Sequence, residues 1–472
     1  MYINGTWIET QKKITIKNPA TLETYQEVYA GDGSHVQKAI EAAEKAFSTW
    51  SVLPAIERAQ YLEKVAAKLL EKKEVLAKTI TSEMGKAITN ARYEVDSTSS
   101  FFKWFAEEAR RTYGETIPST KPNKRLMEIK QPVGIVAAIT PWNFPLSMGA
   151  RKLAPALAAG CTVILRPSNA SPSSAIELFK IFEECEFPPG IVNLVIGSAK
   201  EVTDPLLVSP KVRKVSFTGS TEVGKELVRK SADTLKRVSM ELGGHAPYIV
   251  FEDADLDLAV EGAITIKFGC AGQQCTSANR IYVHNNIHDE FIAKYAKRIQ
   301  QLKVGNGIDD SCEVGPLINE AAIQKVQEHV EDAVNLGATL VAGGKQLKEG
   351  PYTNGYFYQP TLLTDVDERM KISYEETFGP VAPVFRFESD EEVIEKANHA
   401  QYGLAAYFFT NDLSRAYKVM EKLEFGIVGI NDPYPFAVEG SFGGFKESGL
   451  GREGGHGIDE YMESKFVSIA LR

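Results

Sequence analysis

The chain has 472 residues, of which 43% are hydrophobic and 24% charged, a composition typical of ordinary soluble globular proteins. This length is too great for one hydrophobic core and predicts roughly two to three domains. The formal net charge is −9, which argues against nucleic acid or an anionic membrane as a partner, because both select a basic surface.

The cysteines and the apolar runs restrict the class further. Five cysteines stand scattered at 161, 185, 270, 275 and 312, which does not make a disulfide framework. No Cys-x-x-Cys or His-Glu-x-x-His spacing offers a metal site. The N-terminus lacks the pattern of a secretory signal, and the longest mostly apolar run, Leu153 to Leu165, is too short to cross a bilayer. We therefore expect a cytoplasmic protein without a bound metal.

The first part of the chain alternates helical and extended patterns. Apolar residues recurring at three and four positions predict helices between Val36 and Arg111. Expected strands then cover 133–139, 162–165, 192–196, 214–217 and 246–251, with helices over 150–159, 174–184 and 222–231. Such alternation is typical of a parallel sheet covered by helices on both faces.

A second series of elements begins after Asp253. Its expected helices are 256–268, 289–302, 320–336, 391–398 and 413–423, and its expected strands are 280–283, 339–341, 384–387, 405–409 and 427–430. The series reads as a second α/β layer, and its topology places a domain boundary near Glu252.

The segment FGCAGQQCTS, residues 268–277, sets Cys275 on a short glycine-containing turn among small and amide residues. A thiol reacts as the thiolate, which needs partial exposure and nearby N–H groups or positive charge to lower its pKa. The alternative is a small buried hydrophobe, the usual state of a free cysteine. Cys270, five residues earlier on the same loop, is the rival nucleophile.

Two further segments could supply the partners of such a thiol. Asn143, bracketed by prolines in PWNFP directly after an expected strand, could aim an amide N–H at a developing oxyanion. Its alternative is a proline-rich turn with a local amide hydrogen bond. Glu241, two residues before a Gly-Gly pair in an apolar stretch, is placed to be desolvated and so to act as a general base. Its alternative is a solvated or salt-bridged residue at a loop edge.

A glycine-rich turn follows the expected strand 214–217. Residues 217–225, FTGSTEVGK, match part of a P-loop, but Glu226 stands where Ser or Thr must bind magnesium. What remains is a helix N-terminus suited to a phosphate, with Gly219 and Ser220 at its start. The usual Gly-x-Gly-x-x-Gly fingerprint is absent from the first strand–helix turn, so dinucleotide binding is plausible, but by another signature.

Taken together, six motifs resemble those of the aldehyde dehydrogenase superfamily. They are PWNFP at 141–145, FTGS at 217–220, ELGG at 241–244, GQxC at 272–275, EETFGP at 375–380 and FGGFKESGxGRE at 442–453. They stand in the family's order over essentially the whole chain. The resemblance is closest to succinate-semialdehyde dehydrogenases, in which a cysteine thioester forms as an aldehyde is oxidised with NAD or NADP.

The resemblance also implies a fold and site residues. The implied fold class is α/β, with a Rossmann-like cofactor domain (1–115 and 135–245), an α/β catalytic domain (246–445) and a small β arm (116–134 and 455–472) that joins subunits into homodimers or homotetramers. Cys275 would be the nucleophile, Asn143 and the Cys275 N–H the oxyanion donors, and Glu241 the base for water. Implied cofactor-binding residues are Trp142, Arg166, Ser168, Asn169, Gly219, Ser220, Leu242, Glu376 and Phe378.

Cofactor preference depends on residues 166–169. The family usually has Lys-Pro-x-Glu here, whereas this chain has Arg166-Pro-Ser-Asn169. Loss of the carboxylate removes repulsion against a 2′-phosphate, and an arginine fork suits phosphate. We expect both cofactors to be used, with a slight lean to NADP.

The substrate is the least determined property. By resemblance, Arg151, Ser448 and Phe442 would line the substrate site, and Arg151 could bind a distal carboxylate as a bidentate pair. The alternative for Arg151 is a cation on a helix surface. The family's second substrate arginine falls at Gly269, and its second loop cysteine at Ser277. We expect a short polar or carboxylated aldehyde, with succinate semialdehyde first and lactaldehyde as the alternative.

Two other classes of function stay open. A relative that passes the thioester to coenzyme A typically lacks the glutamate that activates water, so Glu241 counts against it. A non-catalytic binding protein would be expected to have lost Cys275, Asn143 or Glu241, and all three are present.

Overall fold

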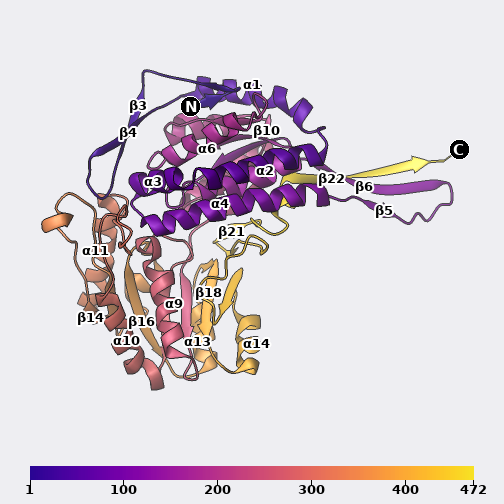
Figure 1. Ribbon diagram of the computed structural model, residues 1–472. Coiled ribbons are helices and arrows are strands. Elements are labelled where there is room, and N and C mark those ends of the chain that lie inside the picture. The colour runs from indigo at the N-terminus through magenta and orange to yellow at the C-terminus, as the bar shows by residue number, and fades with distance from the viewer. Residues whose placement is uncertain (472) are drawn as a thin grey trace.

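The computed structural model describes residues 1–471. Two mixed α/β layers, each built on its own sheet, stack one above the other, and a long narrow β arm leaves the side of the first (Figure 1). Two separate hydrophobic cores match these layers: one gathers residues from the two ends of the chain, and the other runs from Ala246 to Ile427. Across residues 1–471, no helix is both long and apolar enough to span a bilayer.

The first sheet has the strand order β2-β1-β9-β8-β7-β10-β11-β21. Its central strands are parallel and almost wholly buried, as expected for a sheet covered on both faces. The strands are β1 (Tyr2–Ile3), β2 (Thr6–Trp7), β7 (Ile135–Ile139), β8 (Thr162–Arg166), β9 (Val192–Leu194), β10 (Val212–Thr218), β11 (Arg237–Glu241) and β21 (Gly449–Leu450).

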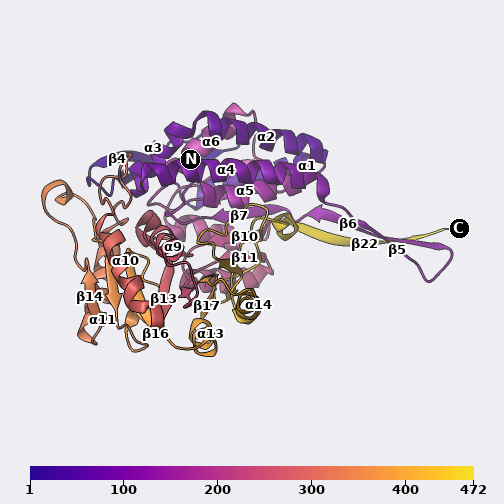
Figure 2. The same ribbon diagram turned by 60° about the horizontal axis from the view of Figure 1, so that its bottom comes forward.

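Helices cover both faces of this sheet (Figure 2). On one face α5 (Ser147–Ala159) and α6 (Ser173–Glu184) pack on the strands, under an outer layer of α2 (Ala55–Glu71), α3 (Lys73–Met84) and α4 (Ile88–Glu108). On the other face lie α1 (Gly33–Trp50), α7 (Asp204–Val208) and α8 (Thr221–Ser231). The long amphipathic helices predicted between residues 36 and 111 are therefore confirmed, as are the first four strands of the first series. The fifth, predicted over 246–251, forms as a strand but belongs to the second sheet, so the boundary expected near Glu252 is wrong and falls before Ala246.

The second sheet has the order β14-β15-β16-β13-β12-β18-β19. Its strands are β12 (Ala246–Val250), β13 (Ala278–His284), β14 (Thr339–Ala342), β15 (Thr361–Thr364), β16 (Val381–Phe387), β18 (Ala405–Phe409) and β19 (Ile427–Ile430). Its helices are α9 (Leu256–Phe268), α10 (His288–Gln300), α11 (Glu320–Asn335), α12 (Lys371–Tyr374), α13 (Asp390–Asn398) and α14 (Leu413–Lys422). The second predicted series is confirmed, with β12, β15 and the single turn of α12 in addition.

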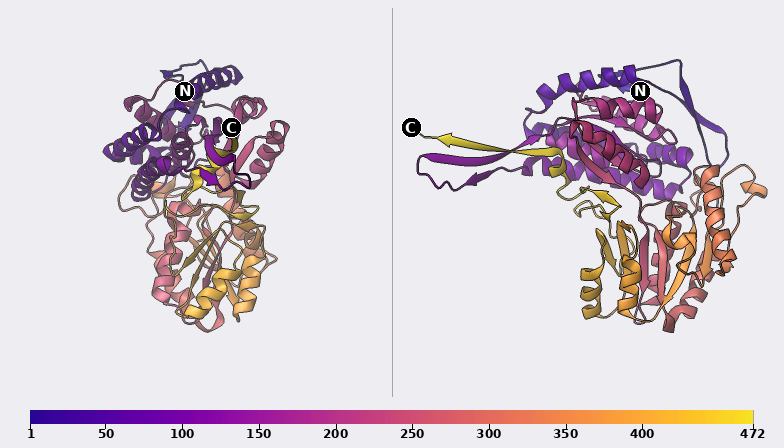
Figure 3. Two further views of the ribbon diagram at one scale, coloured as in Figure 1. Left: turned by 90° about the vertical axis from the view of Figure 1, so that its right-hand side faces the viewer. Right: turned by 180° about the vertical axis from the view of Figure 1, so that it is seen from behind.

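The arm is a three-stranded antiparallel sheet of β5 (Glu115–Ile117), β6 (Lys124–Pro132) and β22 (Met462–Ala470). Strand β22 pairs with β6 from Met462 opposite Pro132 to Ala470 opposite Lys124. From behind, the arm points away from both layers, with the C-terminus at its tip (Figure 3). A separate hairpin of β3 (Lys13–Lys17) and β4 (Thr24–Tyr29) crosses toward the second layer.

Candidate functional site

The site lies where the two layers meet. Asn143 follows β7, and Glu241 is the last residue of β11, so both stand at the carboxyl edge of the first sheet, where ligands of parallel sheets bind. Cys275 stands three residues before β13, at the amino edge of the second sheet. The two edges touch: a Cβ on Gly244 would lie 2.0 Å from the carbonyl oxygen of Cys275. Glycine at position 244 is thus needed for close approach to the cysteine loop.

The loop before Cys275 has an unusual backbone. Cys270 and Ala271 adopt positive φ angles of 52° and 54°, which are uncommon for residues with a side chain. Gln273 anchors the loop, because its Nε2 donates to the Cys270 carbonyl at 3.2 Å and its Oε1 accepts from the Ile318 N–H at 2.9 Å. Strained backbone held in this way clusters at functional sites.

Asn143 reaches this loop from the first layer. It is buried, and its Nδ2 donates to the carbonyl oxygen of Gln273 at 2.9 Å. An amide nitrogen carries two hydrogens, so one N–H remains for another acceptor. The sequence predicted that the Asn143 amide would point toward the reacting group. In the structure this amide binds Gln273, which stands two positions before Cys275 in the chain.

Cys275 itself is only partly exposed. Burial, followed by the charges of the carboxylates of Glu376 and Glu241, raises the pKa of its thiol to about 12. The pKa of the thiol is therefore raised, not lowered, in the protein without ligands, chiefly because the sulfur is buried. Cys270 is almost fully buried and its pKa is also raised by burial.

Glu241 is buried, and neither of its carboxylate oxygens has a hydrogen-bond partner. Desolvation, and next the negative charge of Glu453, raise its pKa well above the usual value, while Lys152 and Arg151 act in the opposite direction. The alternative of a solvated or salt-bridged residue is excluded by this burial. A buried, unpaired carboxyl with a raised pKa is suited to accept a proton near neutral pH.

A buried ionic chain lies beside Glu241. The Nζ of Lys152 is fully buried and contacts Glu453 Oε1 at 2.5 Å and Thr218 Oγ1 at 2.6 Å. The other oxygen of Glu453 lies 3.7 Å from Nη1 of Arg151. The sequence offered no role for Lys152, because Glu453 follows it by 301 positions. Its one sequence signal is a lysine within the apolar helix stretch 147–159.

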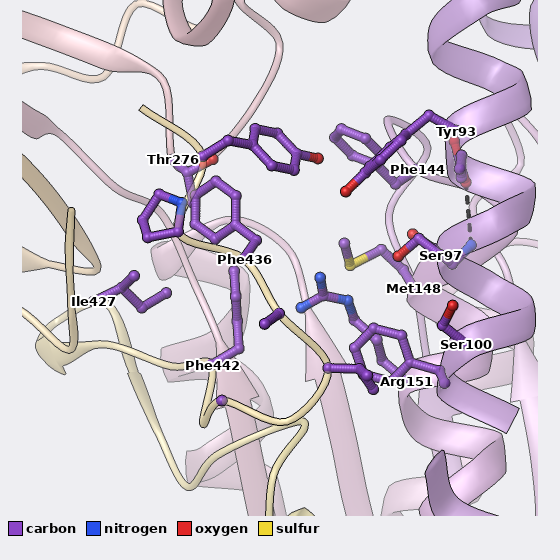
Figure 4. Close-up of a pocket in the computed structure, with 18 of the residues that line it drawn as sticks. Tyr93, Ser97, Ser100, Phe144, Met148, Arg151, Thr276, Ile427, Phe436 and Phe442 are labelled. Atoms are coloured by element: carbon purple, nitrogen blue, oxygen red, sulfur yellow. Dashed lines mark hydrogen bonds between the residues drawn. The ribbon is translucent and has the colours of Figure 1, made fainter. Parts of the chain in front are cut away.

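Cys275 opens on a cavity of about 340 Å³ between α4, α5 and the loop that follows β19. Arg151 projects into this cavity from α5, and Phe436 and Phe442 border it on the loop (Figure 4). The guanidinium lies over the ring of Phe442 at 4.4 Å and over that of Phe101 at 4.8 Å. Its Nε and Nη1 are buried without a hydrogen-bond partner. The alternative of an exposed helix cation is thereby excluded.

Of the other two predicted substrate residues, one lines the cavity and the other does not. Phe442 lines the cavity and stacks on Arg151. Ser448 does not line it: the residue is fully buried, donates to the Gly243 carbonyl at 2.7 Å and accepts from the Gly403 N–H at 2.9 Å. The prediction that Ser448 binds substrate is wrong, because its hydroxyl joins two backbone segments instead.

The predicted cofactor residues surround the same edge of the first sheet. Ser220 is the N-cap of α8, and its hydroxyl accepts from the Val223 N–H. Gly219 precedes it, and Leu242 packs against Gly224, where a Cβ would lie 2.4 Å from a Leu242 methyl carbon. The start of α8 is thus held close to the end of β11. Such a helix N-terminus offers free N–H groups to a phosphate.

Aromatic and acidic side chains lie at the junction of the layers. The rings of Trp142 and Phe378 meet edge to face at 5.7 Å. Glu376 Oε1 accepts from the Gly244 N–H at 3.1 Å, and burial raises the Glu376 pKa to about 7. Trp142 comes from the first layer and Phe378 from the second, so the two layers together form this wall.

Residues 166–169 follow β8. Arg166 is largely buried; its Nη2 donates to the Gly197 carbonyl at 3.2 Å and its Nε has no partner. Ser168 accepts from the Ala170 N–H at 3.2 Å. Asn169 lines a different cavity, shared with Glu83, and its Oδ1 is buried without a partner. An orphaned guanidinium N–H at a carboxyl edge fits an anionic ligand.

Comparison with known proteins assigns the class. Residues 7–467 match the model of the aldehyde dehydrogenase family. The chain is 47% identical to a glutarate-semialdehyde dehydrogenase of Pseudomonas putida over 100% of its length and 97% of that protein's. It is 47% identical to an NADP-dependent succinate-semialdehyde dehydrogenase of Escherichia coli (99% and 97%).

A crystal structure titled as an NADP-dependent enzyme of E. coli superposes with a TM-score of 0.98 at 47% identity, covering 100% of this chain and 98% of that one. The chain belongs to the aldehyde dehydrogenase family, which oxidises aldehydes with NAD or NADP.

Proposed function

We propose that this enzyme oxidises a short aldehyde with an anionic group at its far end, succinate semialdehyde first, to the carboxylic acid. The observation that carries the proposal is Arg151, a partly buried cation in the cavity onto which Cys275 opens. Its Nε and Nη1 make no hydrogen bond. A carboxylate there would gain charge-assisted hydrogen bonds. The succinate- and glutarate-semialdehyde enzymes act, by name, on aldehydes that carry such a carboxylate.

Cys275 is the proposed nucleophile. Its sulfur, as the thiolate, bonds to the carbonyl carbon, and the carbonyl oxygen becomes an oxyanion. The second N–H of Asn143 Nδ2, with the Cys275 backbone N–H, would hold that oxyanion, since the first is held by Gln273 at 2.9 Å. Each such donor is worth about 3 kcal/mol in the transition state. When bound, NAD or NADP supplies the hydride acceptor.

Glu241 is the proposed base for the second half of the reaction. Its carboxylate removes a proton from water, the oxygen of that water bonds to the thioester carbon, and the Cys275 thiolate leaves. Water is thereby selected over a thiol such as coenzyme A. Glu453 and Lys152, buried next to Glu241, are positioned to set its pKa through their charges.

The enzyme is expected to use both cofactors and to prefer NADP slightly. Arg166 at the end of β8 keeps an unpaired Nε, and Asn169 replaces a carboxylate that would repel a 2′-phosphate. The N-terminus of α8 with Ser220 would take the pyrophosphate, and Glu376 the nicotinamide ribose. Trp142, Ser168, Gly219, Leu242 and Phe378 would line the rest of the cofactor site.

We further propose that residues 1–115 and 135–245 form the cofactor domain and 246–445 the catalytic domain. Residues 116–134 and 455–472 would form the arm that joins subunits into dimers or tetramers. The exposed apolar side chains of Ile129, Phe466 and Ile469 on the projecting arm support an assembly role.

The test is a substrate panel on wild type and two cysteine variants. Cys275→Ala should abolish dehydrogenase activity while cofactor binding remains, and Cys270→Ala should stay active. Wild type should prefer succinate semialdehyde to lactaldehyde, propanal, benzaldehyde and betaine aldehyde in kcat/KM. Survival of Cys275→Ala, or a preference for benzaldehyde or betaine aldehyde, would contradict the proposal.

A further inference from the structure

A second cavity of about 210 Å³ adjoins the one onto which Cys275 opens. We call it the side chamber. It is lined by Lys86, Asn90, Tyr93, Phe144, Thr265, Gly269, Cys270, Gln274 and Tyr434. Four of these residues, Tyr93, Phe144, Gln274 and Tyr434, also line the larger cavity, so the two spaces share a wall.

The chamber is open beside Gly269 because this residue has no side chain. Gly269 ends α9 with a φ of −52°, a backbone conformation that any residue can adopt, so its turn does not require glycine. A Cβ built on it meets a single neighbour within 4 Å, the Nε2 of Gln274 at 3.1 Å. Any larger side chain at this position would project into the chamber.

The side chain of Gln274, which lies between the two cavities, can also change its conformation. Gln274 directly precedes Cys275, lines both cavities and donates from Nε2 to the Gly269 carbonyl at 2.8 Å. This is its single hydrogen bond to the rest of residues 1–471 through the side chain, and one rotamer change would release it. A substrate tail that enters the chamber beside Cys275 would pass this amide, which is held in place by one hydrogen bond.

The chamber carries no net charge. Its one cation, Lys86, is fully buried and pairs with Glu94 at 2.7 Å. The second oxygen of Glu94 accepts from the N–H groups of Leu146 and Ser147 at the start of α5, which fixes the pair in place. Lys86 also lies 3.5 Å over the ring of Phe144. Arg151 does not line this chamber.

The remaining walls are aromatic or neutral. The rings of Tyr93 and Tyr434 meet edge to face at 5.5 Å across the shared boundary. Asn90 and Thr265 add an amide and a hydroxyl, and Cys270 a buried thiol with a raised pKa, which is uncharged at neutral pH. Such a surface favours an uncharged, partly apolar tail over an anion, which would find no unpaired cation.

We propose that the aldehyde site is forked: Arg151 ends one branch and takes an anionic tail, while the chamber beside Gly269 takes an uncharged tail such as a phenyl or alkyl group. The inference rests on the proposed role of Cys275 as the nucleophile. It predicts that the enzyme also oxidises longer neutral aldehydes, with the carbonyl at Cys275 and the tail beyond Gln274.

The experiment compares kcat/KM for 3-phenylpropanal, propanal and succinate semialdehyde in wild type, Gly269→Leu and Gly269→Ala. Propanal is too short to reach either branch and reports the chemistry alone. The leucine side chain should fill the chamber and lower kcat/KM for 3-phenylpropanal about tenfold or more. The kcat/KM for propanal should stay within about threefold of the wild-type value. Alanine should have a smaller effect in the same direction.

The matched control is Ser100→Leu, which adds the same side chain to the larger cavity, outside the chamber. This variant should leave kcat/KM for 3-phenylpropanal close to the wild-type value. The inference is overturned if wild type does not oxidise 3-phenylpropanal, if Gly269→Leu leaves it unchanged, or if both Gly269 variants lose propanal turnover equally. Failure of the proposed function is separate, because it appears in Cys275→Ala or in the response of succinate semialdehyde to Arg151 variants.

Discussion

Arg151 provides the sharpest test of the substrate assignment. Its guanidinium is held between the rings of Phe101 and Phe442, and its Nε and Nη1 make no hydrogen bond, although Nη1 lies 3.7 Å from Glu453. A carboxylate bound there gains hydrogen bonds to a charged group, each worth about 1.5–3 kcal/mol net. Because the side chain is already fixed by the two rings, little conformational entropy is lost on binding.

We therefore expect Arg151→Ala to lose about 2–3 kcal/mol of transition-state binding for succinate semialdehyde. This corresponds to a fall in kcat/KM of about 30- to 150-fold. Propanal, which has no distal charge, should stay within about threefold. Arg151→Lys keeps the charge but not the planar fork, so it should recover only part of the loss.

The assay is the initial rate of cofactor reduction at subsaturating aldehyde, with both substrates on the same enzyme preparation. Arg151→Gln is the matched variant that keeps N–H donors and removes the charge. Equal losses for propanal and succinate semialdehyde would mean that Arg151 acts through the fold of the cavity or the pKa of Glu241, and not through a distal carboxylate. An unchanged value for succinate semialdehyde would refute the carboxylate interaction altogether.

Three further outcomes are expected. Glu241→Gln should still form one equivalent of reduced cofactor per active subunit in a rapid burst, while steady-state turnover falls about 100-fold or more, because only thioester hydrolysis needs the base; loss of the burst would contradict this. Lys152→Met removes a charge that lowers the Glu241 pKa, so the rising limb of kcat against pH should move to higher pH. Arg166→Ala should raise KM for NADP more than for NAD, and equal changes in steady-state kinetics would count against the 2′-phosphate role.

Much of the fold could be predicted because its central elements have strong patterns. The buried strands β7 and β8 and the long helices before residue 111 show clear apolar runs or helical periodicity. Strand β11, RVSME, was not predicted, since it is short and half polar. The exposed hairpin of β3 and β4 was missed for the same reason, as its alternation is mostly of polar residues.

Local motifs were enough to propose the candidate catalytic positions, but the electrostatics of those positions could not be predicted. Cys275 lies among carboxylates contributed by β11 and by the segment before β16, and no local sequence reports that neighbourhood. The exclusion of Ser448 depends on hydrogen bonds to residues 45 and 205 positions away. Pairing across such distances is a property of the folded chain alone.

The buried ionic chain connects Arg151, the proposed substrate residue, to Glu241, the proposed base. Arg151 and Lys152 are consecutive, both face Glu453, and all three charges act on the pKa of Glu241. Arg151 lowers that pKa, so its removal raises it and slows thioester hydrolysis at a pH below the new value, whatever the aldehyde. The two effects of an Arg151 variant are separable, because the pKa effect fades as pH rises through that value, whereas the lost carboxylate contact does not. The selective loss for succinate semialdehyde must therefore persist at alkaline pH, where Glu241 is ionised in both proteins.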